Sequence, residues 1–142
     1  MARRIANVTA ALIWQNGKYL IAQRCSPVHL AGKWEFPGGK IKAGEGEQAC
    51  LVRELGEELG VSVEVSNPFG VYAHDYGEAV GIVRLFVYCC RILAGEPQPL
   101  VHRALRWATP QELLTYEFAD ADVPIVRDVL GIAAEGSMGS QR

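Results

Sequence analysis

Apolar residues recur along the chain in short runs that are typical of β-strands. Residues 5–14 are rich in β-branched and aliphatic side chains and lead into Asn16-Gly17, a pair typical of a tight hairpin turn. Residues 19–23 then predict the returning strand. Residues 34–36 alternate in polarity and stop at Pro37-Gly38-Gly39, which we interpret as a tight turn that lets a ligand approach the main chain.

A helical period replaces the strand pattern in the middle of the chain. At about 100° per residue, one apolar stripe is formed by Leu51, Val52, Leu55 and Leu59. Such a stripe predicts a helix that seats one face on a core. Gly60 is its expected C-cap, because glycine readily adopts the left-handed conformation that ends helices.

Further strands and two helices are predicted after Gly60. Residues 61–65, 69–73, 80–92 and 104–107 are strand-like, with turns at 75–78 and 94–96. Thr109 and Glu112 have the spacing of a capping box and, with Pro110, predict a short helix to Leu114. A last amphipathic helix is expected from Asp122, with its apolar positions at Ile125, Val126, Val129 and Leu130.

Several strands around one central helix, with a closing helix, predict an α+β fold: an α/β/α sandwich with a mixed sheet. A length of 142 residues suits a single domain, which we place at residues 1–134. Residues 135–142 are small and polar, and are expected to form a flexible tail.

Composition and charge exclude several classes of function. A net charge of −2 gives no electrostatic basis for binding polymeric nucleic acid. The longest apolar run, near residues 80–93, contains Arg84 and Arg91, so no membrane span is predicted. The N-terminus lacks the apolar core of a signal peptide, which predicts a cytoplasmic protein. The ordinary composition predicts a monomer or a homodimer. The four cysteines lack zinc-site spacing, so we expect reduced structural thiols.

Three carboxylates gather on the central helix. Glu54, Glu57 and Glu58 fall within an arc of about 100°, beside the apolar stripe. Like charges at these spacings weaken a helix by a few tenths of a kcal/mol per pair. Clustered carboxylates suit a hard divalent cation such as Mg²⁺, which also binds phosphates. The alternative is a solvated acidic face without a ligand.

The surrounding spacing is G-x5-E-x7-R-E-U-x-E-E-x-G-U, where U is a bulky aliphatic residue, and it resembles the signature of the Nudix hydrolases. The matching positions are Gly39, Glu45, Arg53, Glu54, Leu55, Glu57, Glu58, Gly60 and Val61. The resemblance implies the Nudix α/β/α sandwich. It also implies that three glutamates bind Mg²⁺, or Mn²⁺ as the alternative, with the carbonyl of Gly38. These glutamates are Glu54, Glu57 and Glu58.

The resemblance also implies roles for individual residues. Glu54 matches a general base of close relatives, and Glu45 is expected to brace the loop before the helix. Arg53 matches a residue that orients a glutamate of the signature. An ion pair from Arg53 to Glu57, four residues later, is an equally available structural explanation.

Outside the signature the chain is similar to MutT-like and CTP pyrophosphohydrolase-like members of the family. The similarity rests on Gln23-Arg24 and on residues 32–39, 105–113 and 121–124. It implies hydrolysis of a (d)NTP to the (d)NMP and pyrophosphate, with (d)CTP-type or oxidised nucleotides such as 8-oxo-dGTP as substrates.

Four residues are candidates for substrate binding, each with a structural alternative. Arg24 is a candidate phosphate contact or a surface charge, and Phe36 a base contact or a core aromatic. Gly39 would allow close approach of the ligand. Asp122 is a reader of the base or the N-cap of the last helix. An ionised aspartate only accepts hydrogen bonds, which suits the exocyclic amine of cytosine.

One position departs from the family pattern. Val101 stands where many relatives carry a further glutamate, so either Glu96 or His102 substitutes for it or an extra metal is held more weakly. Two other functions remain open. The chain could act on another nucleoside diphosphate-linked substrate, such as ADP-ribose, a dinucleoside polyphosphate or capped RNA. It could also be a non-catalytic nucleotide-binding module.

Overall fold

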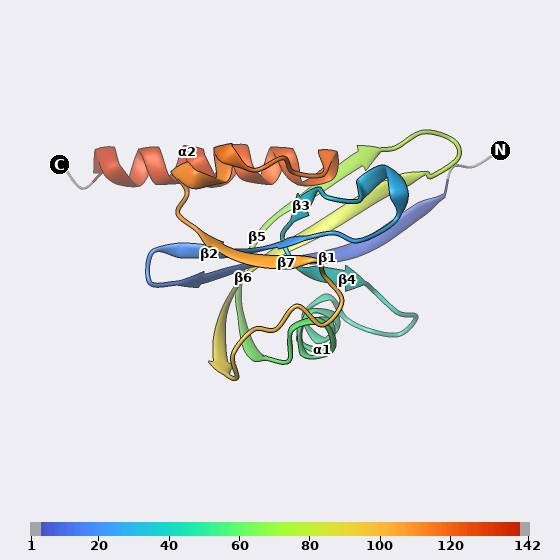
Figure 1. Ribbon diagram of the computed structural model, residues 1–142, viewed down its shortest axis with the longest axis horizontal. Coiled ribbons are helices and arrows are strands. Elements are labelled where there is room, and N and C mark those ends of the chain that lie inside the picture. The colour runs from blue at the N-terminus through green and yellow to red at the C-terminus, as the bar shows by residue number, and fades with distance from the viewer. Residues whose placement is uncertain (1–3, 140–142) are drawn as a thin grey trace.

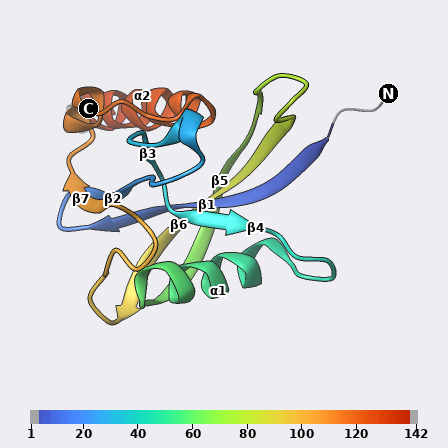
Figure 2. The same cartoon turned by 45° about the vertical axis from the view of Figure 1, so that its right-hand side comes forward.

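The computed structural model describes residues 4–139, with side chains described up to residue 132. A twisted sheet lies between two helices, α1 (Glu47–Leu59) on one face and α2 (Val123–Gly139) on the other (Figure 1). The view turned by 45° shows the same three layers (Figure 2). The predicted α/β/α sandwich is therefore confirmed. Among the described residues, no helix is long and apolar enough to cross a membrane.

The sheet is mixed, as predicted. Its strands are β1 (Ile5–Gln15), β2 (Lys18–Gln23), β3 (Trp34–Glu35), β4 (Gly38–Lys40), β5 (Ser62–Asp75), β6 (Ile82–Ala94) and β7 (Ala104–Ala108). The main path runs β3-β2-β1-β6-β5, while β4 pairs with β1 and β7 with β2. The β1–β6 pairing is parallel and the others are antiparallel. Strand β1 therefore stands at the centre of the molecule.

The hairpin between β1 and β2 forms at the predicted pair. Asn16 and Gly17 both have positive φ, 53° and 79°, which matches the twist of the flanking strands. Trp14 then faces Tyr19 across the ladder. This local turn sets the register of the two strands.

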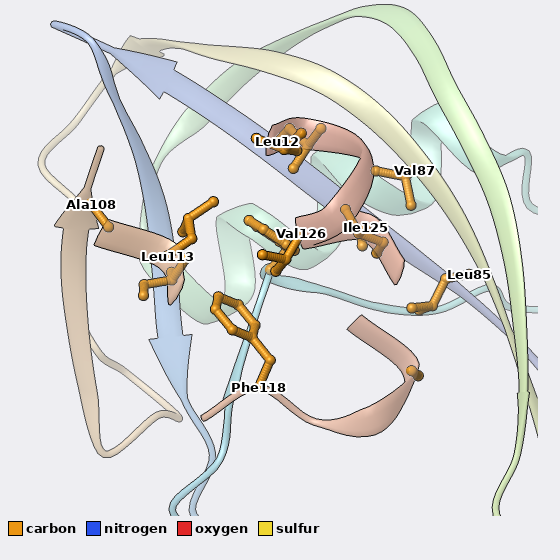
Figure 3. Packing of buried hydrophobic residues seen from close by; sticks show 13 residues of the cluster. Leu12, Leu85, Val87, Ala108, Leu113, Phe118, Ile125 and Val126 are labelled. Carbon is orange, nitrogen blue, oxygen red and sulfur yellow. The ribbon is translucent and has the colours of Figure 1, made fainter. Parts of the chain in front are cut away.

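Alternation along β1 divides the core in two, because successive side chains of a strand point to opposite faces. Ala10 and Leu12 pack in a cluster with Ile125 and Val126 of α2 (Figure 3). Ala11 and Ile13 pack in a second cluster with the leucines of α1. The same strand thus supports both helices and fixes their positions relative to the sheet.

Helix α1 ends at Gly60, which adopts φ 71° as the predicted C-cap. Its buried residues are Cys50, Leu51, Leu55 and Leu59. The predicted apolar stripe was wrong at Val52, which is 44% exposed, and Cys50 takes the buried position instead. The Cys50 thiol fits this place because it packs against Thr9 and the main chain of β4.

Three other predictions are corrected. Gly38 and Gly39 form strand β4 rather than a turn, because they pair with Ala10 and Thr9 of β1. The two strands predicted at 61–65 and 69–73 are one strand, β5, interrupted by bulges around Pro68. The capping box forms as predicted, with reciprocal bonds between Thr109 and Glu112, but it opens the 3₁₀-helix η2 (Gln111–Thr115).

Helix α2 is longer than the predicted last helix. Helix α2 continues to Gly139 through residues that were assigned to the tail. Residues 140–142 lie outside the described residues. The division of the chain at residue 134 stays a prediction.

Candidate active site

One cavity of about 500 Å³ opens between β1, the segment β3–β4, helix α1 and the short 3₁₀-helix η3 (Asp120–Asp122). Its charged and titratable lining includes Arg24, Glu35, Glu54, Glu58, His102 and Asp122. These residues come from separate parts of the sequence, and the fold brings them to one place. The cavity is the candidate active site.

Strand β4 lets the carboxylates of α1 lie against the main chain. A Cβ on Gly38 would stand 1.9 Å from the carbonyl oxygen of Thr9, and one on Gly39 would stand 2.2 Å from Glu54 Cδ. Thr9 Oγ1 donates to the Gly39 carbonyl at 3.2 Å, which holds β4 in place. Two glycines are therefore required by close approach on both sides.

Arg53 ties the carboxylates of the signature together. Its guanidinium donates to Glu54 at 2.8 Å, to Glu57 at 2.9 Å, and to both oxygens of Glu45 at 2.7 and 2.9 Å. Both interpretations of Arg53 therefore describe real contacts. Glu45 also accepts from the backbone N–H of Lys42 at 3.0 Å, so it braces the loop before α1. These contacts, with the Arg53 bond first, lower the pKa of Glu45 to about 2.

The three predicted metal-binding glutamates differ in their position relative to the cavity. Glu54 and Glu58 line the cavity, whereas Glu57 lies outside its lining, 53% exposed and held by Arg53. Burial, followed by the negative charges of Glu35 and Glu54, raises the pKa of Glu58 to about 8. Glu58 Oε1 is buried and has no hydrogen-bond partner among the residues that the structure describes. Buried polar atoms normally have a hydrogen-bond partner, so this oxygen is an unsatisfied acceptor.

A divalent cation fits this arrangement. Among residues 4–132, whose side chains are described, no three His, Cys, Asp or Glu side chains form a preassembled metal site. Mg²⁺ needs no such set, because it keeps several waters and shares its remaining positions between one or two carboxylates and substrate phosphates. Glu54 and Glu58, with the main-chain carbonyl of Gly38, could hold it here. The unpartnered Glu58 oxygen could then serve as a ligand of the cation.

Asp122 reaches the cavity from η3. Its carboxyl is 5% exposed, and Oδ2 accepts the backbone N–H of Phe36 at 2.9 Å. That hydrogen bond links the Asp122 carboxyl to the segment between β3 and β4. Among the described residues, the Asp122 side chain forms no capping hydrogen bond to α2. Burial and the charge of Glu35 raise the pKa of Asp122 well above its usual range, so the carboxyl can serve as a donor when it is protonated.

The Phe36 ring belongs to the core. It is 2% exposed and stacks on Phe118 with ring centroids 5.3 Å apart, although the residue also lines the cavity. The contribution of Phe36 that the structure shows is therefore its backbone N–H to Asp122. Contact between this ring and a base stays a prediction.

Two site residues were missed or left open by the sequence. Glu35 was not singled out, yet it lies in the cavity wall between Arg24 and His102. The alternation Trp34-Glu35-Phe36 was the available signal, because it turns a lone carboxylate away from two aromatic neighbours. Of the two substitutes considered for Val101, His102 is buried in the cavity and Glu96 is exposed outside it.

The fold and the site together define a hydrolase domain with helical carboxylates arranged for a divalent metal. The family model described as "NUDIX domain" matches residues 9–128. The chain therefore belongs to the Nudix family, and it is a Nudix hydrolase, an enzyme of a family that generally needs divalent metal ions.

Named relatives and solved structures agree with this assignment. The chain is 37% identical over 131 residues to the CTP pyrophosphohydrolase of Escherichia coli K12, covering 92% of this chain and 96% of that protein. It is 41% identical over 132 residues to the "putative 8-oxo-dGTP diphosphatase 2" of Mycobacterium tuberculosis, covering 90% and 93%. The solution structure of the E. coli ORF135 protein has a TM-score of 0.80 at 34% identity, covering 94% of each chain.

Proposed function

We propose that this protein is a Mg²⁺-dependent nucleoside triphosphate pyrophosphohydrolase, which converts a (d)NTP and water to the (d)NMP and pyrophosphate. The observation that carries the proposal is one cavity lined by Glu54 and Glu58 of α1 and by Asp122 of η3. The first two suit a phosphate-bound cation, and the third suits recognition of a base. Mn²⁺ is the expected substitute for Mg²⁺.

The substrates we propose are (d)CTP-type nucleotides and oxidised nucleotides such as 8-oxo-dGTP. Two relatives support this range, since they are named for CTP and for 8-oxo-dGTP, respectively. An ionised Asp122 would accept from the amine of cytosine, whereas a protonated Asp122 would donate to a purine acceptor. The raised pKa of Asp122 favours the protonated form relative to a free aspartate.

Glu54 is the residue we propose as the general base. One of its oxygens accepts from Arg53, which fixes the carboxylate beside the backbone of β4. The other oxygen is then placed to orient a water and take its proton. A bound divalent metal would supply neutralisation of the phosphate charge. Arg24, on the cavity wall, is the proposed phosphate contact, and Gly39 lets the ligand approach.

We further propose that the enzyme acts on free nucleotides in the cytoplasm, as a monomer or homodimer. The test is pyrophosphate release with Mg²⁺ from (d)CTP, 5-substituted dCTP, dGTP and 8-oxo-dGTP, beside ADP-ribose and a dinucleoside polyphosphate. We expect one of the first four to have the highest kcat/KM. A preference for ADP-ribose or the dinucleotide would replace the proposed substrate class. Absence of turnover on every compound would indicate a nucleotide-binding module.

A further inference from the structure

Three side chains on the cavity wall form a network that the metal site and the base contact do not explain. One oxygen of the Glu35 carboxylate accepts a hydrogen bond from Arg24 Nη1. The other oxygen lies 2.9 Å from His102 Nε2. A carboxylate only accepts hydrogen bonds, so the hydrogen is on His102 Nε2 and the imidazole donates. Both oxygens of Glu35 are therefore held by hydrogen bonds, which fixes the orientation of the carboxylate.

The network joins three segments around the end of β2. Glu35 pairs with Ala22 across the β2–β3 ladder. The N–H of Arg24 donates to the Lys33 carbonyl at 2.8 Å, and that of Arg103 donates to the Gln23 carbonyl at 2.9 Å. These backbone bonds bring Arg24, just after β2, Glu35 in β3 and His102, just before β7, to the same place.

Burial decreases along the network. The side chain of His102 is 5% exposed, that of Glu35 15%, and that of Arg24 29%. A buried carboxylate is costly unless it is paired. His102 is the inner partner of Glu35, and Arg24 is the outer partner, nearest to solvent.

Arg24 is held so that part of its guanidinium stays available. Its Nε donates to the Ser26 carbonyl at 3.1 Å, and its Nη1 donates to Glu35. In the described part of the chain, Nη2 donates to no protein acceptor. A planar guanidinium fixed at two nitrogens, with a third free, is suited to a phosphate oxygen.

We propose that His102 is a positioning residue for substrate binding: it fixes Glu35, and Glu35 fixes Arg24 in the orientation that binds the phosphate chain. The proposal rests on the proposed nucleotide substrate. It differs from a purely structural role of His102, in which loss of the imidazole would weaken the fold and leave substrate affinity unchanged.

The test uses two replacements of His102 in the full chain. In His102→Gln the amide nitrogen takes the place of Nε2 and can still donate to Glu35, whereas His102→Leu removes that donor. We expect His102→Leu to raise the KM for the preferred nucleotide about tenfold with kcat within about threefold, because ground-state binding is lost. His102→Gln should stay within about twofold of the wild-type KM.

A double-mutant cycle separates positioning from an independent effect. Arg24→Ala should raise KM by a similar factor, and adding His102→Leu to it should raise KM by less than about twofold more, because the two residues act through one contact. Independent, multiplicative effects would overturn the proposal. A melting temperature for each variant shows whether it is folded, and His102→Asn replaces His102→Leu if the leucine variant does not fold.

The remaining outcomes are also decisive. An unchanged KM in a folded His102→Leu variant would overturn the proposal, as would a His102→Gln variant as impaired as His102→Leu. Failure of the proposed function is recognised separately, since the wild-type enzyme would then hydrolyse none of the nucleotides and no variant would need to be compared.

Discussion

Gly39 lies directly against the Glu54 carboxyl, and a Cβ at Gly39 would stand 2.2 Å from Glu54 Cδ. The contact joins the first residue of the Nudix signature to its proposed base. Strand β4 is fixed on its other side by Thr9, so it cannot move away from the helix. The glycine therefore defines where the Glu54 carboxylate can stand.

Replacement of Gly39 should lower the activity of the enzyme without unfolding it. In Gly39→Ala the Glu54 carboxylate must leave its position, and displacement of a catalytic group by about 1 Å can reduce the rate about 10²-fold. We expect a loss of kcat of that order, measured by pyrophosphate release. Gly131→Ala is the matched control, because its Cβ would meet nothing within 4 Å. Equal activity of Gly39→Ala and the control would contradict this account.

Replacement of Arg53 by lysine should impair activity although the charge is conserved. Its guanidinium reaches Glu45, Glu54 and Glu57 at once, and the compact ammonium of lysine cannot reproduce that geometry. Arg53→Lys should lower kcat about tenfold, because Glu54 loses a fixed donor. Steady-state kinetics will show whether the loss is in kcat. A variant with wild-type kcat would mean that the Arg53 bond does not orient the base.

Divalent metal binding should depend on pH through Glu58. The free protein holds the pKa of Glu58 at about 8, and only the ionised form is a ligand, so a proton competes with the metal below that pH. The apparent affinity for Mg²⁺ should fall by up to about tenfold per pH unit as the pH drops from 8 toward 6. Calorimetric titration at several pH values measures it. Glu58→Gln should bind more weakly and lose this dependence; a variant with the wild-type profile would exclude Glu58 as a ligand.

Asp122 should make the metal-free protein less stable as the pH rises. Its pKa is raised on folding, so between the unfolded and folded pKa values the native state holds the proton and the unfolded state does not. The free energy of unfolding then falls with pH, by at most about 1.4 kcal/mol per unit.

Asp122→Asn removes this titration and keeps an oxygen that can accept from the Phe36 N–H. Urea unfolding between pH 4.5 and 8 should therefore show a weaker fall in stability for Asp122→Asn than for the wild type. Asp120→Asn, at an exposed carboxylate two residues earlier, is the control and should follow the wild-type curve. If the Asp122→Asn and wild-type curves are parallel, the carboxyl is not protonated in the native state.

Local sequence signals predicted most of the elements because their causes are local. Asn16-Gly17 specified the hairpin, Gly60 the end of α1, and the Thr109–Glu112 pair the start of η2. The failures depend on distant contacts. Gly38 and Gly39 were interpreted as a turn because nothing in their neighbourhood shows that β1 lies on one side of them and Glu54 on the other.

Residue spacing predicted the part of the site that lies on one helix, whereas Arg24 and Asp122 were predicted from the family resemblance. The spacing of Glu54 and Glu58 placed both on one face of α1, and both line the cavity. The same spacing offered an ion pair between Arg53 and Glu57, but it could not show that Glu57 lies outside the cavity lining. The Glu35–His102 pair joins residues 67 positions apart, and the pairing of β2 with β3 and β7 is what brings them together.

The central claim is that Glu54 serves metal-dependent hydrolysis of a nucleoside triphosphate. The most direct test compares pyrophosphate release by the wild type, Glu54→Gln and the control Glu64→Gln, with Mg²⁺ and the preferred nucleotide. Glu64 is an exposed carboxylate on β5, outside the cavity lining. The account predicts wild-type turnover in the control and a fall in kcat of about 10²-fold or more in Glu54→Gln, with the fold intact. Near-normal turnover in Glu54→Gln would contradict the account.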